Sequence, residues 1–220
     1  MFHIREMQTE TQKRTIVFDL DGVLWDDITA VLRMRMRTTE TFFAQAYCEF
    51  VVTALSLFPK TMAKRVENLN KSALDEDAIA AASQLHGLGY DILVRTSNDT
   101  VDPNKLKKLL GKRGIPVQID EPVCLSGKAA PVKGKMPIVM EDSTVSIIAS
   151  LLRAIREDNR HRDDATFLLV KKDYNRFLGW FISKIDRNVV RLDNARNAPA
   201  AIDTMLRGGG HGKAKLKSTC

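Results

Sequence analysis

This chain of 220 residues contains few cysteines, and it has no apolar stretch long enough to cross a bilayer. The three cysteines, Cys48, Cys124 and Cys220, are an odd number without the spacing of metal ligands, so we expect reduced thiols, the first two in the core. The most apolar segment, residues 50–58, is about half the length of a membrane-spanning helix. The first fourteen residues lack the apolar core of a secretion signal. We therefore expect a cytoplasmic protein that spans no membrane.

Strong charge of one sign is also missing from most of the chain. The formal net charge is +7, but residues 207–220 contribute four of these charges and contain no acidic residue. The remainder is only mildly basic, so nucleic acid is not the expected partner. With 44% hydrophobic and 28% charged residues, the composition is that of a soluble globular protein rather than a disordered one.

Short apolar segments, several of them rich in β-branched residues, alternate along the chain with segments of helical periodicity. Strands are expected at residues 15–18, 91–95, 123–125, 137–140, 165–170 and 188–192. Helices are expected at residues 75–88, 105–110, 143–156, 178–185 and 199–206. This alternation predicts an α/β fold with a doubly wound parallel sheet.

The fifty or so residues between the first two strands are too many for one crossover helix. Apolar residues recur every four positions from Phe42 to Phe58, until Pro59 ends the pattern, which indicates a small helical insertion. The predicted organisation is an N-terminal extension at 1–13, a core at 14–27 plus 76–206, a helical cap at 28–75 and a disordered basic tail at 207–220.

Carboxylates follow two of the predicted buried strands. Asp19 and Asp21 come directly after the first strand and precede Gly22, while Glu141 and Asp142 follow the fourth. Taken singly, each pair can be a turn or a helix cap. Because ligands bind at the carboxyl ends of parallel strands, convergence of both pairs makes an oxygen-rich site that suits Mg²⁺.

Polar residues also follow the second strand, where Thr96, Ser97 and Asn98 stand in sequence. A hydroxyl and neighbouring backbone N–H groups at a strand end suit phosphate oxygens, although such residues are also common in turns.

A lysine between the third and fourth predicted strands can offset the charge of an anionic nucleophile and a phosphate. Lys128 is the favoured candidate, while Lys133 and Lys135 are nearby alternatives for the same role.

In their order and context, these four segments resemble the motifs of the haloacid dehalogenase (HAD) superfamily of phosphotransferases. The motifs read IVFDLDGVL at 16–24, LVRTSN at 93–98, GKAAP at 127–131 and IVMEDS at 138–143. The resemblance covers residues 15 to 145 approximately. It implies a Rossmann-like core with a helical cap inserted after the first strand.

The resemblance also implies roles for the catalytic residues. Asp19 is expected to be the nucleophile that forms an aspartyl-phosphate, and Asp21 the general acid and base. Thr96 is expected to hydrogen-bond the phosphoryl group, and Lys128 to offset its charge.

For the metal, the resemblance implies Mg²⁺ held by Asp19, by the backbone carbonyl of Asp21 and by Asp142, with Glu141 as a ligand or just outside the coordination sphere. Substrate contacts are expected from three further residues: Gly22, Ser97 and Asn98.

The predicted function is therefore that of a Mg²⁺-dependent phosphatase, a phosphoric monoester hydrolase acting on a small phosphorylated metabolite. One alternative is a phosphomutase of the same superfamily, which differs mainly in how well the cap excludes water. Another is a noncatalytic, phosphatase-like binding module whose basic tail touches nucleic acid.

Overall fold

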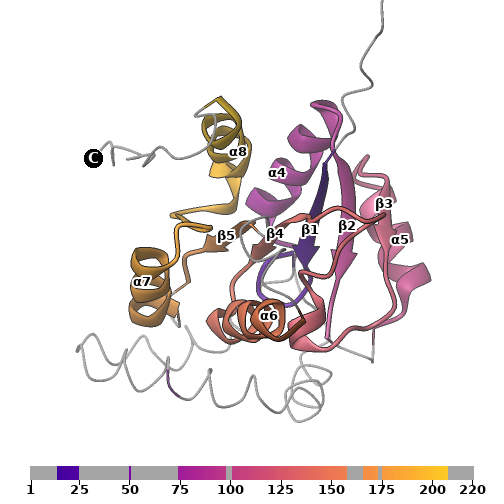
Figure 1. Ribbon diagram of the computed structural model, residues 1–220. Coiled ribbons are helices and arrows are strands. Elements are labelled where there is room, and N and C mark those ends of the chain that lie inside the picture. Colours follow the sequence, from indigo (N-terminus) through magenta and orange to yellow (C-terminus); the bar gives the residue numbers. More distant parts are fainter. Residues whose placement is uncertain are drawn as a thin grey trace, which may run out of the picture.

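A six-stranded parallel sheet forms the centre of the protein (Figure 1). The computed structural model describes residues 14–24, 50, 74–97, 101–157, 166–172 and 175–207. The strands are β1 (Thr15–Asp19), β2 (Asp91–Arg95), β3 (Val117–Ile119), β4 (Ile138–Glu141), β5 (Thr166–Val170) and β6 (Val189–Leu192). Their order is β3-β2-β1-β4-β5-β6, and every neighbouring pair is parallel. The predicted doubly wound α/β sheet is confirmed.

Helices cover both faces of the sheet, which explains why the central strands are continuously apolar. Helices α4 (Glu76–Gly87), α5 (Pro103–Gly111) and α8 (Ala198–Arg207) pack with Ile16 and Phe18 of β1 on one face. Helices α6 (Thr144–Glu157) and α7 (Arg176–Ile185) pack with Val17 on the other. None of the helices in the described ranges combines the length and apolar character needed to cross a bilayer.

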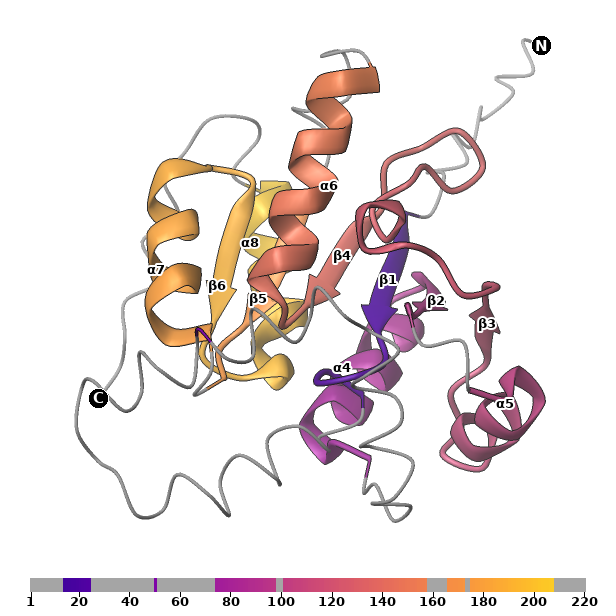
Figure 2. The ribbon, with the colours of Figure 1, turned by 90° about the horizontal axis from the view of Figure 1, so that it is seen from below.

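The strand order reverses between β1 and β4, which lie side by side in the middle of the sheet. The chain reaches β4 from β3 through a long connection that contains a short 3₁₀ helix, η1 (Leu125–Gly127), next to α6 (Figure 2). In open parallel sheets such a reversal leaves a crevice at the carboxyl ends of the strands, where ligands bind. The topology therefore favours a site at the ends of β1 and β4.

The two ends of the predicted insertion meet at this same edge of the sheet. The backbone N–H of Asp75 donates to the carbonyl of Leu24 at 2.9 Å. The Asp75 side chain also caps α4 by accepting from the N–H groups of Asp77 and Ala78. Of residues 25–73 only Phe50 is described, so the predicted cap, apart from residues 50, 74 and 75, lies outside the described residues. The same is true of the N-terminal extension and of residues 208–220.

One predicted strand is wrong. Residues 123–125 form no strand: the N–H of Val123 donates to the carbonyl of Thr96, and the chain then turns into η1. The edge strand is β3 instead, which pairs with β2 over only three residues. Cys124, expected in the core, is exposed because it precedes η1 on this surface connection. The other five predicted strands and the five predicted helices outside the insertion agree with the structure to within two residues at each end.

A buried amide ties the end of β4 to the end of β5. Asn175 is 1% exposed, and its Nδ2 donates to the carbonyls of Asp142 at 2.7 Å and Val170 at 2.8 Å. Its Oδ1 accepts from the N–H of Lys172 at 2.8 Å. Buried backbone groups need such partners, so this side chain fixes the loop that carries Asp142.

Replacing this amide should measurably destabilise the fold. Asn175→Ala leaves several buried backbone groups without their partner, and we expect the free energy of unfolding to fall by roughly 2–3 kcal/mol. Urea unfolding measures this change. Asn104→Ala is the control, because Asn104 is exposed on α5 and should change stability by less than about 0.5 kcal/mol. Equal effects of the two substitutions would contradict the bridging role.

Candidate active site

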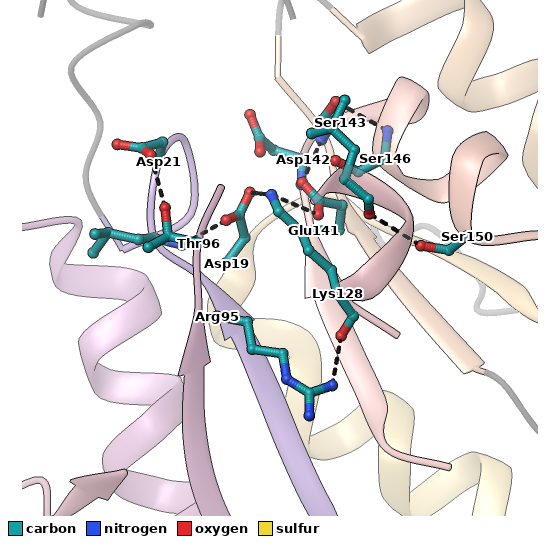
Figure 3. Close-up of polar contacts among 12 residues, drawn as sticks. Asp19, Asp21, Arg95, Thr96, Lys128, Glu141, Asp142, Ser143, Ser146 and Ser150 are labelled. Carbon is teal, nitrogen blue, oxygen red and sulfur yellow. Dashed lines mark hydrogen bonds and ion pairs between the residues drawn. The ribbon is translucent and has the colours of Figure 1, made fainter. Parts of the chain in front are cut away.

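Side chains from β1, from β4 and from the loop after η1 meet at the edge that the topology favours (Figure 3). Asp19 is the last residue of β1, Glu141 is the last residue of β4, and Asp142 follows it. All three are buried, being 2%, 1% and 2% exposed. The strands are hydrogen-bonded neighbours, and for this reason carboxylates more than a hundred positions apart in sequence share one site.

The ammonium group of Lys128 lies among these carboxylates. Its Nζ is 2.5 Å from Asp19 Oδ2 and 3.1 Å from Glu141 Oε2, and the lysine is 4% exposed. The alternatives Lys133 and Lys135 are exposed, in the turn closed by the bridge between Val132 and Lys135. The geometry therefore places Lys128 at the candidate nucleophile.

Both oxygens of Asp19 are engaged. The backbone N–H of Leu20 donates to Oδ1 at 2.8 Å, while Lys128 holds Oδ2. These contacts orient the carboxylate at the end of its strand.

Glu141 acts both as a cap and as a member of the cluster. Its Oε1 accepts from the backbone N–H groups of Asp142 at 3.2 Å and Ser143 at 3.0 Å, at the start of α6. Its Oε2 faces Lys128. One oxygen of Glu141 therefore caps the start of α6, while the other faces the charged cluster.

Gly22 allows the loops after β1 and β4 to touch. Its φ is +89°, in the region that favours glycine, and a Cβ atom at this position would overlap the Asp142 carboxylate. The predicted substrate-binding glycine is thus a position of close approach between two of the motifs.

Thr96 contacts Asp21. The buried Thr96 hydroxyl donates to Asp21 Oδ2 at 3.1 Å, so the described contact is with the predicted acid and base. Ser97 follows as a partly buried residue, and Asn98 lies outside the described residues. The end of β2 therefore joins the same site from the other side of β1.

The proximity of these charges changes their protonation equilibria. Burial, and then the charge of Glu141, raise the pKa of Asp19 well above its ordinary value, although Lys128 acts in the opposite sense. Burial likewise raises the pKa of Glu141. For Lys128 burial acts to lower the pKa, but the charges of Asp19 and Glu141 outweigh it and raise the pKa.

The donor set of the cluster fits a hard divalent cation. Oxygens of Asp19, Glu141 and Asp142 lie within 4.8 Å of one another, which suits a single ion with oxygen ligands. Three buried carboxylates surround one lysine, so the ionised cluster carries more negative than positive charge. A divalent cation would balance the excess, as Mg²⁺ does in oxygen-rich sites.

The described residues form a Rossmann-like α/β core, and the four motif segments gather around the reversal of its strand order. This arrangement is consistent with the HAD-like core expected from the sequence. No family model and no curated protein matches the sequence. Among solved structures, the HAD domain of effector protein Lem4 from Legionella pneumophila is 16% identical, with 80% of this chain and 95% of that chain covered and a TM-score of 0.41. A phosphoserine phosphatase in apo form is 17% identical, with 77% and 82% covered and a TM-score of 0.32.

The sequence analysis did not single out two buried polar residues near the site, Arg95 and Asn175. Arg95 is 6% exposed at the end of β2, and a charged residue within a buried strand is the signal that could have identified it. Asn175 follows the end of β5 by five residues and has no comparable signal, because asparagine is ordinary in a turn before a helix.

The raised pKa values of Asp19 and Glu141 predict how stability depends on pH without a divalent metal. A carboxyl group with a higher pKa in the folded than in the unfolded chain stabilises the fold fully below its unfolded-state pKa. That contribution is lost as the pH rises through the folded-state pKa. As the pH rises above the ordinary carboxyl range, about pH 4, the contribution of these groups to the unfolding free energy in EDTA should therefore fall, as measured by urea unfolding.

The Asp19→Asn variant tests this expectation directly. An amide does not titrate, so the variant should gain stability relative to the wild type as the pH rises. Asp91→Asn is the control, because Asp91 is exposed at the opposite end of the neighbouring strand. A constant stability difference between Asp19→Asn and wild type across the series would contradict the raised pKa.

Proposed function

We propose that the protein is a Mg²⁺-dependent phosphoric monoester hydrolase that acts on a small phosphorylated metabolite through an aspartyl-phosphate on Asp19. One observation carries the proposal: Asp19 is buried at the sheet edge with Lys128 at 2.5 Å and Glu141 and Asp142 beside it. A carboxylate held between a lysine and a candidate cation site is arranged for attack on an anionic phosphoryl group.

In the first step, an Asp19 oxygen forms a bond to phosphorus while the bond from phosphorus to the leaving oxygen breaks. The leaving oxygen takes a proton from the Asp21 carboxyl group and departs as an alcohol. Lys128 forms an ion pair with Asp19, and its positive charge reduces the repulsion between the carboxylate and the phosphate. Transfer of this kind depends on alignment and charge neutralisation.

In the second step, the Asp21 carboxylate takes a proton from a water molecule whose oxygen attacks phosphorus. The bond to Asp19 breaks, inorganic phosphate leaves, and both aspartates return to their starting states. The hydrogen bond from Thr96 to Asp21 supports a role for Thr96 in orienting the acid and base. In this proposal Thr96 acts through Asp21 and also hydrogen-bonds the phosphoryl group.

The metal would be held by Asp19, Asp142 and the backbone carbonyl of Asp21, with Glu141 as a further ligand or as the partner of Lys128. Bound there, Mg²⁺ would neutralise charge on the equatorial phosphoryl oxygens.

Hydrolysis of p-nitrophenyl phosphate with and without Mg²⁺ tests the proposal. Asp19→Asn should reduce kcat by at least about a thousandfold, because an amide cannot form the acyl-phosphate, and a thousandfold corresponds to about 4 kcal/mol in the barrier. Asp91→Asn should retain wild-type activity. If Asp19→Asn keeps activity to within about tenfold of wild type, Asp19 is not the nucleophile.

The cation requirement is tested at Asp142. Asp142→Asn removes one anionic oxygen from a site that must compete with hydration of the ion, so half-saturation by Mg²⁺ should move to at least about tenfold higher concentration. Asp203→Asn, an exposed change on α8, is the matched control. An unchanged Mg²⁺ dependence in Asp142→Asn would remove Asp142 from the coordination sphere.

A further inference from the structure

Arg95 is a buried cation beside the site that the proposed reaction does not use. It ends β2, precedes Thr96, and pairs in register with Asp19 of β1. Its side chain is 7% exposed. A guanidinium group is placed in the interior of a protein only when its donors are satisfied, so the partners of Arg95 show what the group holds.

The guanidinium joins the end of β2 to two other segments of the chain. Its Nε donates to Asp120 Oδ2 at 2.7 Å, just after β3. One terminal nitrogen donates to the backbone carbonyls of Lys128 at 3.0 Å and Ala130 at 2.6 Å (Figure 3 shows the first). The residue that aims its ammonium at Asp19 is therefore held at its own carbonyl by Arg95.

The loop that carries Lys128 has little regular structure of its own. Its 3₁₀ helix η1 has three residues, and the local bonds are turns from Gly127 N–H to Cys124 at 2.8 Å and from Ala130 N–H to Gly127 at 3.0 Å. The Ser150 hydroxyl of α6 contacts the loop earlier, at the carbonyl of Leu125. Arg95 contacts the loop at the carbonyls on both sides of Ala129, one of which belongs to Lys128 itself.

From these contacts we infer that Arg95 is a positioning residue for the site: it holds the backbone on either side of Ala129 so that Lys128 meets Asp19 and Glu141. This inference rests on the proposed function, because it assigns Arg95 a role in turnover through Lys128. The planar guanidinium suits the task, since it directs donors to a carboxylate and to backbone carbonyls at fixed angles. A lysine at position 95 would keep the charge but lose this geometry.

Steady-state kinetics with p-nitrophenyl phosphate and Mg²⁺ give the first test. Arg95→Met should lower kcat by at least about tenfold and change KM by less than about threefold, because the lysine contacts the nucleophile. Arg95→Lys should lie between Arg95→Met and wild type. The control Arg113→Met removes an exposed ion pair with Glu76 and should leave both constants unchanged. An unchanged kcat in Arg95→Met overturns the inference.

A double-mutant cycle distinguishes positioning from a general structural role. If Arg95 acts through Lys128, adding Arg95→Met to Lys128→Met should lower kcat by less than about threefold further. Loss of the full single-mutant factor in that background would mean that Arg95 acts independently of the lysine, and would overturn the inference. If Arg95→Met does not fold, Arg95→Lys takes its place in the cycle.

Amide hydrogen exchange separates this inference from the proposed function, because it needs no turnover. Arg95→Met or Arg95→Lys should increase exchange in residues 124–131 relative to wild type, whereas Arg113→Met should not. Unchanged exchange overturns positioning by Arg95 whatever the activity. Increased exchange in a protein whose wild type hydrolyses no phosphate ester would support the structural part of the inference and reject the proposed function.

Discussion

The ion pairs that join Lys128 to Asp19 and Glu141 are the interaction on which the candidate site depends. Each carboxylate ends a neighbouring strand and is almost fully buried, a position that costs several kcal/mol for an isolated charge. The lysine carries a similar cost. The attraction between the opposite charges at short distance offsets part of the cost, although the pKa of Asp19 stays well above its ordinary value. Removal of Lys128 would leave both carboxylates buried without an opposite charge beside them.

The surrounding structure supplies the precision that these ion pairs need. β1 and β4 set the separation of Asp19 and Glu141 through their shared ladder, while Asn175 holds the loop after β4 against β5. Negative charge nonetheless exceeds positive charge within the cluster, so the fold retains an electrostatic imbalance where chemistry is proposed. Such local conflicts with stability are expected at functional sites.

The sequence predicts most of the sheet and the main charged groups, because both leave short-range signals. A buried parallel strand is a short apolar run, and carboxylates directly after it stand out, as Asp19 and Glu141 do. The choice of Lys128 over its neighbours depends on how a short 3₁₀ helix packs, which no local pattern encodes. The edge strand β3 was missed because three paired residues give too little periodicity. The contact between Thr96 and Asp21 joins two loops that only the sheet order brings together.

The backbone hydrogen bond between Leu24 and Asp75 makes the structure of the core largely independent of the number of residues between these two positions. Leu24 and Asp75 are hydrogen-bonded to each other, so the fifty or so residues between them form a loop whose two ends are held together at the sheet. The entropic cost of closing such a loop grows only with the logarithm of its length, by about 0.6 kcal/mol of free energy for each doubling. Evolution can therefore lengthen, shorten or exchange this segment at small cost to the strands beneath it. The junction lies at the carboxyl end of β1, so such changes would occur next to the carboxylate cluster without altering the strands that position it.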